Sequence, residues 1–354
     1  MVLVLTLGLV VTGCGSNGGS GDSAKADSGS KKEANADGYQ VVNIGFPSAG
    51  YEWAEGALAV AEEKGYLDEY LNPLGYDADL IPFTGAAPAI HEALVSGDLD
   101  YAYYAGFAGI MAKSNGIDTK LLAVTSFGSV WQLAVSADSG ITSLEDLKGK
   151  TISYQRGATP QMYVLKVLEE AGLSADDVQL VNSTIPEGLS SLSTGAVDAA
   201  VVTYGQADTL VEQGKASILH KGVDADADTF YEPSVLTGRT DFVSKNADVS
   251  SAIIEAMLKA RDDIISDPEA FYELSSEKSG RTLEQVKSVA VSDIELAYPV
   301  SLDERYITSL KNIEQFELDN DIITSQVDLI PGLIPPIWIR QYRIIRETQS
   351  REDS

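Results

Sequence analysis

Short apolar runs alternate with helix-like segments from residue 39 onward. The run at 39–46 is rich in β-branched residues and predicts a strand, whereas 51–67 has apolar residues at helical spacing and ends near Gly65. Further strand-like and helix-like segments follow in the same order at 77–83, 87–97 and 99–107. This alternation predicts an α/β protein with largely parallel sheets.

A second series of the same kind begins near residue 131. Within it, Thr159 is expected to be an N-cap, Pro160 the first helical residue and Gly172 the stop of one helix. After a strand-like run at 233–243, only helical patterns follow, at 249–266, 267–278, 282–294 and 303–320. These helices need a surface to cover, so we expect the chain to return to the first lobe and leave a ligand cleft between two lobes.

One motif occurs once in each series. The pattern P-x8-G-x2-D places Asp100 and Asp198 after a helix and before an apolar strand, each preceded by a glycine that can end the helix. We interpret both aspartates as scaffold residues at the start of their strands. Ligands gather at the carboxyl ends of strands in open α/β sheets, so the functional expectation moves downstream to 104–106 and 203–205.

Composition and charge limit the partners. The chain has 354 residues, enough for two cores, and a formal net charge of −28. Such a surface repels polyanions, and no basic patch for a phosphate backbone is evident. Nucleic acid is therefore excluded as a partner.

The N-terminus has the features of a lipoprotein leader. An apolar run from Val2 to Val11 is followed by "VTGC", which resembles a lipobox and would make Cys14 the lipidated residue, although no Lys or Arg precedes it. Cys14 is the only cysteine, so no disulfide partner exists within the chain. Residues 15–38 contain no large apolar side chain and are expected to be a disordered tether.

The chain offers little material for catalysis. It has two histidines, His91 within a helix-like segment and His220 in an expected polar turn, and no cysteine after Cys14. No nucleophile with a base and no metal cluster is evident, so we expect no enzyme activity, no cofactor and no metal. A ligand sensor on the same fold would need a signalling domain, and only the atypical tail at 331–354 follows the core.

Several motifs together resemble one family. The segments "EKGYL", "FTGAAPAIHEALVSGDLDYAYYAG", "SLEDLKGKTISYQRGAT" and "RTDFVSKNADV" are similar to the sulfonate, taurine and nitrate group of periplasmic-type solute-binding proteins of ABC importers. The resemblance implies a two-lobed type II periplasmic-binding-protein fold, each lobe a mostly parallel sheet flanked by helices. It also implies a small solute, which we expect to be anionic, and an ABC permease with its cytoplasmic ATPase as partner. The lipobox and the tether fit a monomer that is lipid-anchored on the outer face of the cell membrane. The expected domains are a signal peptide at 1–14, the tether at 15–38, lobe 1 at 39–130 and 230–330, lobe 2 at 131–229, and the tail at 331–354.

Candidate ligand-binding residues follow from the local sequence pattern and from the family resemblance. In "YQRGATPQ" a strand ends and a helix begins, so backbone amides and Arg156 can face an anion. The resemblance adds the loops after the first two strands, and aromatic residues at strand ends supply apolar walls. The expected set is Ser48, Tyr51, Trp53, Thr84, Gly85, Ala86, Tyr104, Gly106, Trp131, Arg156, Gly157, Ala158, Thr159, Thr203 and Tyr204.

The aromatic walls favour a solute with an organic group over a bare inorganic anion. We therefore expect an aliphatic sulfonate or taurine. Nitrate, bicarbonate and a thiamine-precursor pyrimidine remain the alternatives within transport. Enzymes on the same fold, of the pyrimidine-synthesising and chorismate dehydratase-like families, are the alternative outside it.

Overall fold

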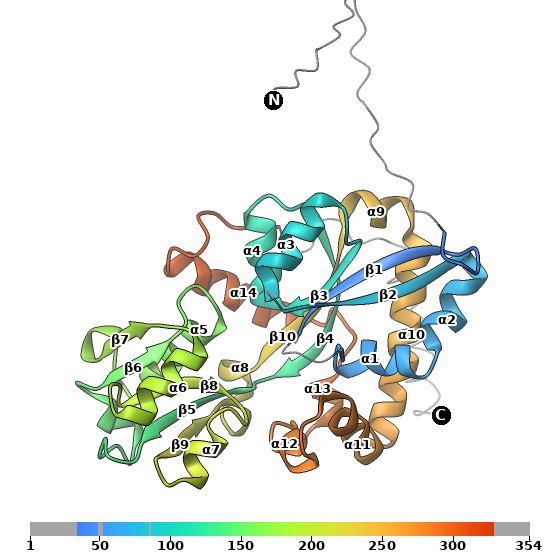
Figure 1. Ribbon diagram of the computed structural model, residues 1–354. Coiled ribbons are helices and arrows are strands. Elements are labelled where there is room, and N and C mark those ends of the chain that lie inside the picture. Colours follow the sequence, from blue (N-terminus) through green and yellow to red (C-terminus); the bar gives the residue numbers. More distant parts are fainter. Residues whose placement is uncertain (1–33, 49–51, 85, 329–354) are drawn as a thin grey trace, which may run out of the picture. The chain divides into compact units, whose positions relative to one another are not determined.

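The computed structural model describes residues 34–48, 52–84 and 86–328, whose strands form two five-stranded sheets (Figure 1). The first sheet has the order β2-β1-β3-β10-β4, with bounds β1 Gln40–Pro47, β2 Tyr76–Phe83, β3 Tyr101–Ala105, β4 Thr119–Gly128 and β10 Glu232–Arg239. The second has the order β7-β6-β8-β5-β9, with bounds β5 Trp131–Ser136, β6 Thr151–Tyr154, β7 Gln179–Asn182, β8 Ala199–Thr203 and β9 Ala216–Lys221. The parts of the chain built on these sheets are called lobe 1 and lobe 2.

In each sheet one strand runs against the other four. Strand β1 pairs in parallel with β2 and β3, whereas β10 pairs antiparallel with β3 and β4. Lobe 2 repeats this pattern, with β6 parallel to β7 and β8, and β5 antiparallel to β8 and β9. The reversed strand of lobe 1 is its last and that of lobe 2 is its first, because the chain crosses from lobe 1 to lobe 2 and back. The expected two-lobed α/β fold with mostly parallel sheets is confirmed.

Helices cover both faces of the lobe 1 sheet. One face is covered by α1 Gly56–Glu63, α2 Tyr66–Leu71 and α10 Ala247–Ser266, and the other by α3 Ala86–Ser96, α4 Gly106–Ser114 and α14 Glu304–Asp319. Tyr101 and Tyr103 of β3 belong to the first core and Ala102 and Tyr104 to the second. Every position of β3 is apolar because neither face meets water.

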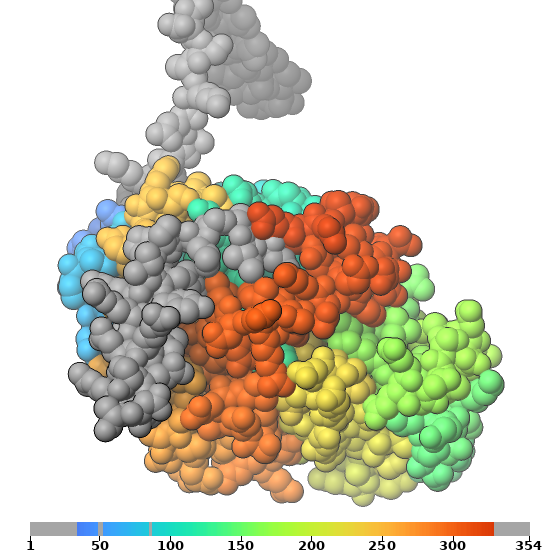
Figure 2. Space-filling model, turned by 180° about the vertical axis from the view of Figure 1, so that it is seen from behind, coloured from blue at the N-terminus to red at the C-terminus, as the bar shows by residue number. Residues whose placement is uncertain are grey.

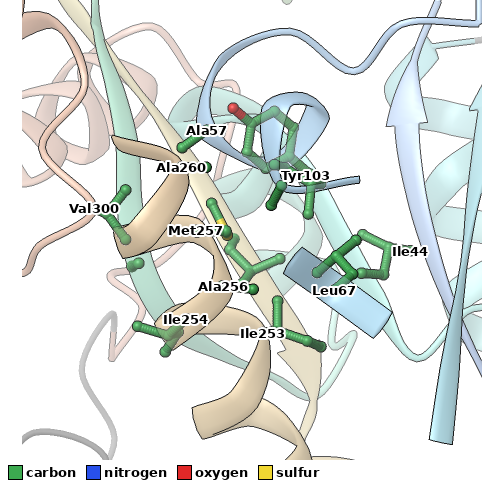
Figure 3. Close-up of a cluster of buried hydrophobic side chains, with 14 of the residues drawn as sticks. Ile44, Ala57, Leu67, Tyr103, Ile253, Ile254, Ala256, Met257, Ala260 and Val300 are labelled. Atoms are coloured by element: carbon green, nitrogen blue, oxygen red, sulfur yellow. The ribbon is translucent and has the colours of Figure 1, made fainter. Parts of the chain in front are cut away.

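The first of these cores is centred on α10. Figure 3 shows Met257 and Ala260 of this helix lying close to Ala57 of α1 and Tyr103 of β3. All four side chains are buried. Helix α10, which follows the return of the chain to lobe 1, thus packs against elements from the first part of that lobe.

Lobe 2 has the same layered arrangement on a smaller scale. Helix α5 Thr159–Glu170 covers one face, and α6 Ile185–Thr194 with α7 Asp208–Glu212 covers the other. Along β8, Ala199 and Val201 belong to the α5 side and Ala200 and Val202 to the opposite core. Alternate residues of one strand thus bind the two helical layers together.

The helices after β10 differ in one place from the expectation. The prediction of one helix over 282–294 is wrong. The chain forms only α12 Leu283–Lys287 and then, after an irregular stretch, α13 Ile294–Ala297. Asp293 starts α13 by accepting hydrogen bonds from the amides of Glu295 and Leu296. The other elements are α8 Ala227–Phe230, α9 Thr240–Lys245, α11 Pro268–Ser279 and the short 3-10 helices Asn72–Leu74, Leu144–Leu147, Ala175–Asp177 and Gly222–Asp224. Figure 2, seen from behind, shows the orange and red segments, which include α11 to α14, across the middle of this face.

The structure describes only a small part of the segments expected to anchor the protein at the membrane. The signal peptide, Cys14 and the tail at 331–354 lie outside the described residues. Residues 34–38, expected to belong to the tether, instead form a turn in which Asn35 donates a hydrogen bond to Asp77 of β2 at 2.8 Å. Within 34–328, no described helix is long and apolar enough to span a membrane.

The repeated motif has the same geometry in both lobes. The carboxylate of Asp100 accepts a hydrogen bond from the amide of Asn43 in β1 at 2.9 Å, and that of Asp198 accepts one from Thr151 in β6 at 2.9 Å. The carbonyl oxygens of the two aspartates accept from β10 and β5 respectively, each the reversed strand of its sheet. Each aspartate therefore ties its own strand to two neighbours, as a scaffold residue should.

Gly238 in β10 is expected to tolerate no side chain. A Cβ atom there would lie 2.5 Å from Cγ2 of Val243 and 2.9 Å from the ring of Tyr101, both fully buried. Gly238→Ala should lower the free energy of unfolding by about 1 to 3 kcal/mol through overpacking. Urea denaturation measures this, with Gly128→Ala as the control, because its Cβ would meet only one atom of Val291 at 3.2 Å. Equal stability of the two variants would contradict the packing described for β10.

Candidate functional site

The loops after the parallel strands of lobe 1 run side by side at the carboxyl edge of its sheet. Ser48 follows β1 and Thr84 follows β2, and the amide of Ser48 donates to the carbonyl of Phe83 at 3.0 Å. Ser48 is half-buried and Thr84 is exposed. The equivalent edge of lobe 2 carries Arg156 beyond β6 and the half-buried Thr203 at the end of β8. Carboxyl edges are where ligands collect in open α/β sheets.

Helix α5 begins at this edge of lobe 2. Its N-cap is Ala158 in an extended conformation, and Thr159 is the first helical residue. The expectation of Thr159 as the N-cap is wrong, because Pro160 already lies inside the first turn. No side chain caps this end. Pro160 has no amide hydrogen and the amide of Gln161 donates to the carbonyl of Ala158 at 2.9 Å, which leaves the amide of Thr159 as the first-turn donor at the positive end of the helix dipole.

Arg156 lies beside this helix end and is exposed. Its backbone amide donates to Oδ1 of Asn182 at 2.9 Å, and its guanidinium Nε donates to the hydroxyl of Tyr154 at 3.2 Å, which raises the pKa of Arg156. The amide of Gly157 donates to Oε1 of Gln161 at 2.8 Å and is therefore already used. The remaining guanidinium N–H groups of Arg156 and the amide of Thr159 are the donors for an anion here.

Two of the expected aromatic walls are partly open to solvent. Trp131 is the first residue of β5 and Tyr204 follows β8, and both are half-buried. The amide of Tyr204 donates to the carbonyl of Val130 at 2.9 Å, which holds the two segments together. These two side chains can supply apolar surface beside the polar donors.

Three other expected site residues lie in the core. Tyr104 is 2% exposed and its hydroxyl accepts a hydrogen bond from Thr237, while Trp53 is 5% exposed within the core of lobe 1. Gly106 is packed against Leu310 and Pro233, with no room for a side chain. The expectation that these residues line the cleft is therefore corrected: all three hold α1, α4 and α14 against the lobe 1 sheet.

Glu232 was missed by the sequence analysis. It is the first residue of β10 and pairs with Gly128, so it lies at the edge where β3 and β4 end. Burial raises the pKa of its carboxyl to about 7, against the charge of Lys166 and hydrogen bonds from the side chains of Thr159 and Trp131. A carboxyl group of lobe 1 thus reaches two expected cleft residues of lobe 2.

A second polar contact joins the lobes nearby. Nε2 of Gln285 in α12 donates to Oδ2 of Asp208, the first residue of α7, at 3.2 Å. The same amide nitrogen would lie 3.4 Å from a Cβ atom at Gly205. Helix α12 therefore covers the turn that follows β8.

A separate cavity of about 570 Å³ lies between α1 and the edge strand β2 of lobe 1. Its charged lining residues are Glu52, Glu62, Glu63, Asp79 and, as the one cation among them, Lys278. The mostly buried Trp53 also lines it. Burial raises the pKa of Glu62 to about 7, helped by the charge of Asp79. This negative lining does not suit an anion.

Both histidines are held by contacts with other residues of the fold. Nε2 of His91 lies 3.1 Å from the carbonyl of Ala108, and burial lowers the pKa of the imidazole. His220 is part of β9, not of a turn as expected, with Nδ1 2.7 Å from the Tyr163 hydroxyl and Nε2 3.2 Å from Glu170. No group of His, Cys, Asp or Glu residues within 34–48, 52–84 and 86–328 is arranged to hold a metal ion.

Some expected site residues cannot be placed. Tyr51 and Gly85 lie outside the described residues, as does the side chain of Ala86. The backbone of Ala86 begins α3, so a second helix starts at the carboxyl edge of lobe 1.

Known proteins similar to this chain are found by sequence and by structure. A family model described as NMT1/THI5 like matches residues 55–271, which is more than half of the chain. A protein of Brucella abortus named as a binding protein is 28% identical over 227 residues, which cover 63% of this chain and 67% of that protein. An aliphatic sulfonates-binding protein of Bacillus subtilis is 24% identical over 261 residues, which cover 73% of this chain and 72% of that protein.

Solved structures share the fold. The periplasmic sulfonate-binding protein SsuA from Methylobacillus flagellatus has a TM-score of 0.71 at 21% identity, covering 82% of this chain and 90% of its own. The desulfurization enzyme DSZB has a TM-score of 0.63 at 18% identity, covering 81% of this chain and 95% of its own. The fold is thus used both by solute-binding proteins and by an enzyme, and at these identities it does not decide between them.

Proposed function

The chain belongs to the NMT1/THI5-like family, and from this premise we propose that it is the solute-binding component of an ABC importer. It captures a small organic anion at the carboxyl edges of its two sheets and delivers it to a membrane permease with a cytoplasmic ATPase. An aliphatic sulfonate or taurine is the proposed solute. The name of the Bacillus subtilis relative and the fold shared with SsuA support this assignment.

The observation that carries the proposal is the open start of α5. The amide of Thr159 and the positive end of a 12-residue helix that no side chain caps lie next to Arg156, at an edge where a ligand is expected. In a chain of net charge −28, such a place concentrates positive potential where an anion can use it. The half-buried Trp131 and Tyr204 add apolar surface for an alkyl group.

In the proposed mechanism, solute binds to lobe 1 first and the hinge then closes. Arg156 and the α5 start complete the site from lobe 2, and their extra contacts favour the closed form. The two connections between the sheets, at 129–130 and 222–231, are the segments where the chain crosses between lobes and are the proposed hinges.

The location belongs to the same proposal. Lipid on Cys14 would hold the protein at the outer face of the cell membrane as a monomer, with the N-terminal tether between anchor and lobes. Nitrate or bicarbonate, and a thiamine-precursor pyrimidine, are the alternative solutes. We infer no enzyme activity, because the sequence offers no cysteine after Cys14 and both histidines have structural contacts.

Arg156→Ala is expected to weaken binding of an anionic solute by about 1.5 to 3 kcal/mol, the contribution of a charged hydrogen bond. Isothermal titration of residues 34–328 with sulfonates, taurine, nitrate and a neutral aminopyrimidine measures the affinity. Lys215→Ala, which removes an exposed cation from the same lobe, is the matched control and should leave affinity unchanged.

Two results would contradict this part of the proposal. Unchanged affinity in Arg156→Ala would remove Arg156 from the site. Tight binding of the neutral aminopyrimidine, with no binding of any anion, would overturn the proposed solute class.

A further inference from the structure

The cavity between α1 and β2 holds more carboxyl groups than cations. Four of its lining residues are acidic, Glu52, Glu62, Glu63 and Asp79, whereas Lys278 of α11 is the one basic residue among them. The ammonium of Lys278 already forms an ion pair with Glu63, at 2.6 Å. Neither Glu62 nor Asp79 has an ion-pair partner within residues 34–48, 52–84 and 86–328. A cation from outside the chain would therefore find carboxyl groups here that no residue of the described structure neutralises.

An indole group of the same cavity lacks a hydrogen-bond acceptor. Trp53 lines the cavity and is 5% exposed, and its Nε1 atom is buried with no hydrogen-bond partner among the described residues. The N–H group of a buried tryptophan usually finds an acceptor, so this one is an exception that needs a reason. Trp53 otherwise packs in the core of lobe 1, so the cavity is the side from which an acceptor can approach.

The other walls and the size of the cavity favour an organic ligand. Apolar residues from three elements line it: Phe46 of β1, Ala59 of α1, and Leu80, Ile81 and Pro82 of β2. Its volume of about 570 Å³ is within the range of sites for small organic molecules. A metal ion would fill little of this space and would leave the apolar walls uncovered. A ligand with a hydrocarbon body would cover them.

We propose that this cavity is a binding site for a small organic cation, a compound with an ammonium group, a hydrocarbon body and one oxygen atom, of which an amino alcohol is the simplest kind. The ammonium group lies against Glu62 and Asp79, and the body contacts the apolar walls. The oxygen accepts a hydrogen bond from Nε1 of Trp53. All these residues belong to lobe 1, so the site is separate from the proposed anion site and does not rest on the proposed function.

Three compounds of nearly equal length make matched probes: 5-amino-1-pentanol, hexylamine and 1-hexanol. Hexylamine has a methyl group in place of the hydroxyl, and 1-hexanol has one in place of the ammonium. Isothermal titration of the unaltered full chain at pH 8, above the raised pKa of Glu62, measures their affinities. Compared with 5-amino-1-pentanol, 1-hexanol should bind about tenfold more weakly or worse, the effect of losing a charged hydrogen bond. Hexylamine should bind about three- to tenfold more weakly, the effect of losing a neutral one.

Variants assign each part of the ligand to its residue. Glu62→Gln with Asp79→Asn removes both unpaired charges and should weaken 5-amino-1-pentanol by about tenfold or more, while 1-hexanol stays within about threefold. Trp53→Phe keeps an aromatic ring but no N–H donor, so 5-amino-1-pentanol should lose its advantage over hexylamine. Glu92→Gln, at an exposed position of α3 on the other side of the lobe 1 sheet, is the control and should change no affinity.

The unaltered protein decides the matter even where a variant fails to fold. Equal binding of 5-amino-1-pentanol and either of the other two probes, or no binding of 5-amino-1-pentanol, would overturn the inference. Displacement of 5-amino-1-pentanol by a sulfonate that occupies the anion site would do the same, because the two sites are separate. Binding of 5-amino-1-pentanol by a protein that binds no anion would support the cation site and overturn only the proposed function.

Discussion

Glu317→Met is expected to raise the free energy of unfolding at pH 7 by about 3 kcal/mol and to flatten its dependence on pH. Glu317 is fully buried on α14, and neither carboxyl oxygen has a hydrogen-bond partner among the described residues. Burial, with the charges of Glu232 and Glu314, raises the pKa of Glu317 from 4.5 to about 9. The folded chain must therefore keep this carboxyl protonated at a pH where the unfolded chain ionises it.

The sign of the pH effect follows from this difference in pKa. Below pH 4.5 the group is protonated in both states, and its contribution to stability is fully retained. Between pH 4.5 and about 9 the folded chain binds more protons than the unfolded chain, so stability is lost as the pH rises. Methionine has nearly the same volume and no proton to lose, so its variant should lack this slope.

Urea denaturation at pH 5, 7 and 8 measures the slopes of the two proteins. Glu304→Met makes the same change at an exposed position of the same helix and should follow the unaltered protein at every pH. Parallel slopes for the unaltered protein and Glu317→Met would show that the folded chain ionises Glu317 without cost.

The second large effect concerns the two scaffold aspartates. Replacing Asp100 and Asp198 together by alanine is expected to lower the free energy of unfolding by about 3 to 6 kcal/mol. Each substitution removes a carboxylate acceptor and leaves a strand amide, of Asn43 or Thr151, without a partner, which costs about 1.5 to 3 kcal/mol. The two sites are in different sheets, so their effects should add.

Asparagine provides the matched control for this pair. Its side-chain oxygen can still accept the amide hydrogen bond, so Asp100→Asn with Asp198→Asn should lose less than half of what the alanine pair loses. Guanidinium denaturation compares the two double variants. Equal losses would show that charge, and not the acceptor at the strand start, is what these positions require.

The fold could be predicted from the chain because its cues are local. Apolar runs, glycines that end helices and the repeated P-x8-G-x2-D motif all act within about ten residues. The motif predicted scaffold roles for Asp100 and Asp198, and the structure places both carboxylates on strand amides. The start of α5 beside Arg156 was likewise visible as a strand end followed by a helix with proline in its first turn.

The candidate site was predicted less completely. Tyr104 lies at the end of β3 as expected, yet it is buried, because α3, α4 and α14 cover the face toward which it points. A strand with helices on both faces shows no alternation of polar and apolar residues, so its sequence does not say which side chains remain open. The sequence did not point to Glu232 as a site residue for a different reason. Glu232 begins β10, a strand far along the chain, and only its pairing with β3 and β4 shows in which direction this strand runs.

The sequence by itself determined the α/β class, the two lobes and the family resemblance, because these depend on periodicity and on short motifs. Only the tertiary structure decided which residues of the two lobes meet. Glu232, Thr159 and Trp131 come together because β10 runs antiparallel to β3 and β4 and therefore starts, with Glu232, at the edge where those strands end. Nothing in the spacing of these residues predicts that contact, since it depends on strand direction and on the packing of one lobe against the other.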